Sequence, residues 1–228
     1  MGVRVRHANI LEDVPQDMLV EILSRVGQNS SAQLFMVKLV CKAFGKLSDD
    51  ALVYKWLSFD RWCISPWRNH KLADTFISSM YFGNPNAIFR YGLRAYFESK
   101  YPDVGLHLLE KASNMQLKEA CYVYGLVMFG SHEIEKKDIG LQILNHTFPP
   151  VPDLVVEVRT KVFDFLRCCW VLFNHHPFDD VATCCTIKVH NGYFPLDHRW
   201  EIILTKPECM SCFWSYELRV FAERFGFN

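Results

Sequence analysis

Apolar residues recur at helical spacing in the first part of the chain. Leu19, Ile22, Leu23 and Val26 follow the i, i+3, i+4, i+7 pattern of one face of an α-helix. Pro15 suits the first turn of that helix, because proline lacks the backbone N–H that an interior helical residue donates. The spacing therefore predicts an amphipathic helix that begins near Pro15.

Two further short helices are expected directly after the first. The polar stretch from Gly27 to Ser31 is expected to break the first helix and to cap the second one with a serine. Val40, Phe44 and Leu47 then give a third segment one apolar side. Such a small unit cannot bury all of its apolar surface, so part of that surface is free to meet a partner. On periodicity alone, an ordinary helical hairpin packed on its own domain is the simpler interpretation.

The spacing of particular residues between positions 14 and 47 is typical of one protein family. A proline start, an isoleucine–leucine pair, and a later Val-Cys-Lys with an aromatic residue three positions after the cysteine together resemble an F-box. The matching residues are Pro15, Leu19, Ile22, Leu23, Val40, Cys41, Lys42 and Phe44. Val14 departs from the leucine that the family usually has, but the change in volume is conservative.

The resemblance implies an F-box at residues 8–58 that binds a Skp-type adaptor and, through it, a cullin-RING ubiquitin ligase. The adaptor-binding residues that it implies are Val14, Pro15, Leu19, Ile22, Leu23, Val40, Cys41 and Phe44. The rest of the chain would then be the substrate receptor for a protein target that the sequence does not name. The alternative is a helical-repeat scaffold that acts outside a ubiquitin ligase.

An internal repeat follows the F-box-like segment. Residues 87–93 align with residues 120–126 at an offset of 33, and Gly105 aligns with Gly140 at an offset of 35. This period belongs to paired-helix solenoids, in which small residues let helices approach closely. The two units resemble SEL-type, tetratricopeptide-like repeats, and we expect them with a capping helix at residues 68–152. Solenoids of this kind offer a concave face to proteins; two hairpins that are similar by chance are the alternative.

In the last segment, residues 153–228, we expect a long apolar helix, which is followed by a region rich in cysteine and histidine. Cys209 and Cys212 have the C-x-x-C spacing that lets two thiolates share one structural zinc. Alternating residues around Asn191-Gly192 indicate a β-hairpin that could present further ligands. The candidate zinc ligands are Cys184, Cys185, His190, Cys209 and Cys212. This end resembles the degenerate MYND-like segments of plant F-box proteins with SEL-type repeats, and buried, inert cysteines are the alternative.

Composition narrows the function classes. The 228 residues carry 25 basic and 25 acidic side chains, so the chain has no electrostatic footprint for nucleic acid or for an anionic membrane. No signal peptide or long apolar run is evident, which favours a cytoplasmic or nuclear protein with reduced cysteines. No phosphate-binding glycine loop, nucleophile elbow or H-E-x-x-H motif is present, so we expect no enzyme, although a Cys/His nucleophile stays open.

These patterns together predict a mainly α protein. It would consist of a three-helix F-box, a short solenoid of helical hairpins, and a small Cys/His-rich tail that contains a β-hairpin and binds at most one structural zinc.

Overall fold

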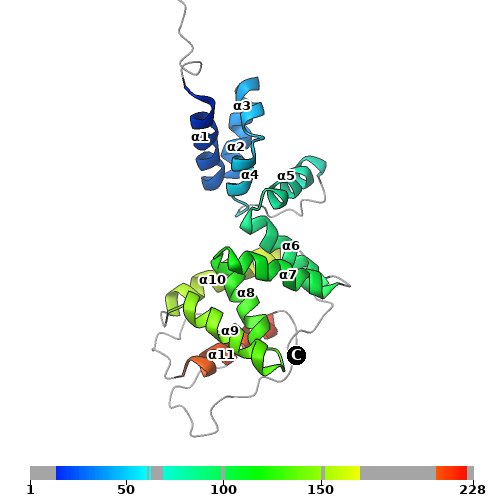
Figure 1. Ribbon diagram of the computed structural model, residues 1–228, viewed down its shortest axis with the longest axis vertical. Helices are drawn as coiled ribbons and strands as arrows, with labels where there is room; N and C mark the ends of the chain where they lie inside the picture. The colour runs from blue at the N-terminus through cyan, green and yellow to red at the C-terminus, as the bar shows by residue number, and fades with distance from the viewer. Residues whose placement is uncertain are drawn as a thin grey trace, which may run out of the picture. The chain divides into compact units, whose positions relative to one another are not determined.

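The computed structural model describes residues 14–60, 62, 69–98, 101–149, 152–169 and 209–224 of the chain (Figure 1). All regular elements in these ranges are α-helices, which confirms the prediction of a mainly α fold. The predicted β-hairpin lies outside the described residues. The described residues up to Ala87 form one compact unit, and those from Ile88 onward form a second. The sequence had suggested a boundary near residue 68.

The first unit contains five helices, α1 to α5, in the ranges that the structure describes. Their bounds are α1 Gln16–Asn29, α2 Ser31–Lys38, α3 Lys42–Leu47, α4 Ala51–Trp56 and α5 His70–Tyr81. Helix α1 packs against α2, α3 and α4, and α5 packs against α4. The buried apolar core of this unit includes Leu23, Leu34, Val53, Leu57 and Phe59.

The first helix ends within the predicted stretch from Gly27 to Ser31, but Gly27 itself lies inside α1 and does not break it. The glycine is buried, and a Cβ there would stand 3.2 Å from Leu34 Cδ2 and 3.4 Å from Leu57 Cδ1. Gly27 therefore serves the close approach of neighbouring elements rather than a turn. The break falls at Ser30, whose hydroxyl oxygen accepts a hydrogen bond from Gln33 N at 3.3 Å. This confirms the predicted serine cap of the second helix.

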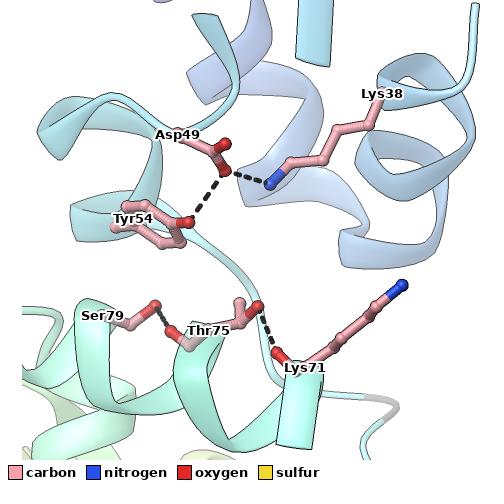
Figure 2. A network of polar contacts seen from close by, with 6 residues as sticks. All are labelled: Lys38, Asp49, Tyr54, Lys71, Thr75 and Ser79. Atoms are coloured by element: carbon pink, nitrogen blue, oxygen red, sulfur yellow. Dashed lines mark hydrogen bonds and ion pairs between the residues drawn. The ribbon is translucent and has the colours of Figure 1, made fainter. Parts of the chain in front are cut away.

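A polar network joins α2 to the start of α4 (Figure 2). The Asp49 carboxylate accepts a hydrogen bond from Lys38 Nζ at 2.7 Å and another from the Tyr54 hydroxyl at 2.9 Å. Burial, then the hydrogen bond to Asp49 and the negative charges of Asp49 and Asp74, raise the pKa of Tyr54 to about 12. The network thus engages the Lys38 ammonium within the unit.

The buried side-chain amide of Asn84 anchors the turn that follows α5. Asn84 donates from Nδ2 to the carbonyl oxygens of Tyr54 and Leu57, at 2.9 Å each, and its Oδ1 accepts from Ala87 N at 3.1 Å. Gly83 just before it has a φ of 79°, a conformation that glycine adopts without strain. These bonds tie the turn after α5 to the end of α4.

The second unit is built around α8. Its helices are the main part of α6 Pro85–Glu98, then α7 Pro102–Asn114, α8 Lys118–Phe129, α9 Ile134–Thr147, α10 Pro152–Cys169 and α11 Met210–Arg224. Helix α8 packs against α7, α9, α10 and α11 (Figure 1). Every residue of α8 from Ala120 to Phe129 is buried.

Within each of the two hairpins the paired helices approach each other closely, as the repeat alignment predicted. A Cβ on Gly105 of α7 would overlap the backbone of Tyr96 in α6, and one on Gly140 of α9 would overlap the backbone of Phe129 in α8. Tyr96 and Phe129 are 33 residues apart, and the two glycines are 35 apart. The same contact therefore forms at equivalent positions of both hairpins, which confirms the helical repeat.

Helices α10 and α11 both pack against α8. Trp214, Leu218 and Phe221 of α11 are fully buried in the core of the second unit. The Trp214 Nε1–H donates to Asn145 Oδ1 at 2.9 Å, which fixes α11 to α9. The chain therefore covers part of α8 with its own helices, and the concave binding face expected of the solenoid stays a prediction. None of the helices in the described ranges has the length and apolar character needed to cross a membrane.

Candidate protein-interaction site on the amino-terminal helices

Helix α1 is apolar on more of its circumference than its own unit covers. Val20 and Leu23 face the core, and Leu23 is only 3% exposed. Around the helix from this side, Leu19 is half-buried, and Met18 and Ile22 are exposed, Ile22 to 52%. Residues four apart lie above one another on a helix, so Met18 and Ile22 form one outward apolar stripe.

A second group of exposed apolar side chains lies where α2 ends. Leu39 is 80% exposed and Val40 is 70% exposed, and Met36 one turn earlier is exposed as well. The backbone here is tied down, because Leu39 N donates to Met36 O at 3.1 Å and Val40 N donates to Val37 O at 3.0 Å. These apolar side chains are thus held outward by an ordered turn. Burying them against a partner would be favourable.

The eight residues that the F-box resemblance implied are placed at three levels of burial. The exposed ones are Pro15, Ile22 and Val40, the half-buried ones are Val14, Leu19, Cys41 and Phe44, and the buried one is Leu23. Leu23 belongs to the core, so it packs beneath the exposed residues of α1 and is not accessible to a partner. Met18, Met36 and Leu39 extend the site and were missed. Met18 and Leu39 each stand next to a motif position, and Met36 lies one helical turn before Val40.

The candidate zinc ligands are described only in part. Cys209 precedes α11 and Cys212 lies in its first turn, where Phe213 N donates to Cys209 O at 3.1 Å. Both cysteines are half-buried. Cys184, Cys185 and His190 lie outside the described residues. Within the described ranges no group of three or more potential ligands could hold a metal ion, so the zinc site stays a prediction.

A buried polar cluster inside the second unit was not foreseen. Glu217 of α11 accepts from Arg159 Nη1 of α10 at 2.7 Å and from the Tyr122 hydroxyl of α8 at 3.0 Å. Burial raises the pKa of Glu217, which the Arg159 charge opposes, and burial also raises the pKa of Tyr122 well above its ordinary value. The cluster is enclosed by core side chains, and we assign it to the docking of α11 rather than to chemistry on a ligand.

The chain is similar to known proteins both in its repeat segment and as an F-box protein. Residues 60–167 match the family described as plant tetratricopeptide repeats. A provisionally named F-box protein of Arabidopsis thaliana, At1g67623, is 31% identical over 156 residues, which cover 67% of this chain and 52% of that protein. The F-box protein At2g35280 of the same plant is 31% identical over 118 residues, 52% of this chain and 72% of the relative. No solved structure matches the chain.

The chain therefore belongs to the F-box proteins, and its residues 60–167 are similar to plant tetratricopeptide repeats. It spans about half the length of the first of these relatives.

Proposed function

We propose that this chain is the substrate-recognition subunit of a Skp–cullin–F-box ubiquitin ligase. The observation that supports this best is the exposure of two motif positions, Ile22 on α1 and Val40 in the turn between α2 and α3. Membership of the F-box proteins favours a Skp-type adaptor as the partner that covers them. The cullin would be reached through the adaptor.

The mechanism that we propose is proximity. The F-box face holds the adaptor, the second unit with the tail holds a protein target, and tethering turns ubiquitin transfer into an effectively intramolecular reaction. The chain itself would carry out no bond chemistry. Since α10 and α11 cover α8, the target would bind on outer surfaces of the repeat or on the remaining tail. We place this activity in the cytoplasm, the nucleus or both.

A second possible function uses the same binding surfaces outside a ubiquitin ligase. In this alternative the chain is a helical-repeat scaffold that joins two proteins, and the exposed residues of α1 and α2 bind a partner that recruits no cullin. Co-purification separates the two functions, because only the first brings down both a Skp-type adaptor and a cullin.

The decisive test compares exposed apolar positions inside and outside the proposed site. Ile22→Asp with Val40→Asp places two charges in the proposed interface, and we expect adaptor and cullin to be lost from pull-downs while the circular dichroism spectrum stays unchanged. Ile134→Asp, at an exposed apolar position of α9, is the matched control and should leave the pull-down intact. Undiminished adaptor binding by the folded double variant would exclude the proposed site.

Leu23→Ala is unsuitable for this test, although Leu23 belongs to the motif. Truncating a buried leucine costs about 2–5 kcal/mol of stability. A loss of binding would then report unfolding rather than a lost contact.

A further inference from the structure

Two lysines point outward from α3, directly after the exposed turn at Leu39 and Val40. Lys42 and Lys46 are both exposed and stand four residues apart, so they share one face of the helix. Phe44 is half-buried on another side. The short helix therefore presents two cations next to an exposed apolar turn.

Two other cations of this unit are paired within it, whereas Lys55 and Lys71 form no ion pair in the described ranges. Arg25 pairs with Glu21 at 3.0 Å, and Lys38 pairs with Asp49 at 2.7 Å (Figure 2). Within the described ranges, no ion pair is formed by Lys42 or Lys46. Like charges four residues apart on a helix repel each other. The unbound unit does not compensate the repulsion between these two lysines. A partner that supplies the opposite charge would relieve it.

We propose that the partner surface covering the F-box combines an apolar patch with carboxylates opposite Lys42 and Lys46. This inference rests on the proposed function and specifies the chemistry of the adaptor side. The apolar patch receives Leu39 and Val40, and the carboxylates lie at its edge. Pairs at the rim of an interface act mainly on the association rate, so binding to the adaptor becomes dependent on salt.

A polyanion is the other occupant that two lysines could attract. Its phosphates would gain nothing from Leu39 and Val40, which are among the most exposed large apolar side chains described. The formal charge of the whole chain is also zero, whereas nucleic-acid-binding surfaces are strongly basic. The combination of apolar and basic side chains favours an acidic protein surface.

The test measures binding of the full chain to a purified Skp-type adaptor at low and high salt. Lys42→Glu with Lys46→Glu should weaken binding about tenfold at low salt, which is the size expected for two rim pairs, and should flatten the salt dependence. Lys55→Glu makes one such charge reversal on α4 and is the control for a single position, to be compared with Lys42→Glu and Lys46→Glu alone. Lys42→Arg with Lys46→Arg keeps the charges and should retain binding.

The outcomes separate this inference from the proposed function. If the wild-type chain does not bind the adaptor, the proposed function fails and this inference fails with it. If the wild-type chain binds and the double charge reversal binds equally well with the same salt dependence, only the acidic-edge proposal is overturned. Displacement of the adaptor by a short duplex DNA, lost in the charge-reversal variant, would favour a polyanion and also overturn it.

Discussion

Glu217 of α11 and Arg159 of α10 form a buried ion pair, with Oε1 of the glutamate 2.7 Å from Nη1 of the arginine. The two residues are 58 positions apart in sequence, and the Tyr122 hydroxyl completes the cluster from α8. A buried charge is costly unless it is paired and hydrogen-bonded. The pair therefore commits α11 to one position against α8 and α10.

Arg159→Met should destabilise the chain by about 3–5 kcal/mol at neutral pH, because the substitution leaves the Glu217 carboxylate buried without its cation. Urea denaturation followed by circular dichroism measures this loss. Lys161→Met breaks an exposed pair with Glu157 on the same helix and should change the midpoint little. Adding Glu217→Leu to Arg159→Met should recover a large part of the stability. A double variant no better than the single one would contradict this role of the pair.

The loss in Arg159→Met should also depend on pH. Burial raises the pKa of Glu217 above its ordinary 4.5, so its contribution to stability is fully present below pH 4.5 and is lost as the pH rises through the folded-state pKa. Arg159 opposes this rise, and its removal moves the folded-state pKa further up. We therefore expect the difference between wild type and variant to be smallest near pH 4 and to grow toward neutral pH. A difference that shrinks as the pH rises would show that the sign is wrong.

Local signals in the sequence predicted the elements well. The Ser30 cap, the amphipathic α1 and the paired glycines of the repeat each depend on a few neighbouring residues or on a fixed period. The sequence did not separate Leu23 from Ile22, which are adjacent motif positions. Which of them is buried depends on where α2 and α4 pack against α1, and periodicity places the apolar side only to within about one residue.

Contacts across long stretches of chain could not be predicted from such signals. Glu217 and Tyr122 are 95 residues apart, and nothing near either one indicates the other. For the same reason the covering of α8 by α11 was missed. An apolar helix that follows a long intervening segment can pack anywhere on an apolar surface, and only the folded arrangement decides where.

Gly105→Ala and Gly140→Ala should each destabilise the second unit by about 1–3 kcal/mol, because the added Cβ overlaps the backbone of the facing helix and something must shift. Gly45→Ala in α3 is the control, since a Cβ there would lie an ordinary 3.5 Å from Lys38 O. Replacing this helical glycine should instead stabilise the chain by up to about 1 kcal/mol. Thermal unfolding distinguishes the three variants. Equal melting temperatures for all of them would contradict the close helix approach at Gly105 and Gly140.

The tail carries the last prediction, which concerns zinc. Cys209 directly precedes α11 and Cys212 lies in its first turn, and their C-x-x-C spacing lets two thiolates share one metal ion. With Cys184 or Cys185 and His190 they would supply the four ligands of a structural site, and we expect about one zinc per chain in protein purified without added metal. Cys209→Ser should lose the zinc and make the tail sensitive to protease, because metal binding contributes to folding.

Cys41→Ser is the matched control, because Cys41 belongs to the first unit and should leave both the zinc content and the tail unchanged. The pair Cys209 and Cys212 has a second use if no metal is bound, since free cysteine packs as a small apolar side chain. A chain without zinc that resists protease as well as one loaded with zinc would show that the two cysteines only pack at the start of α11. In that case the buried pair of Glu217 and Arg159 would hold this helix in place without a metal.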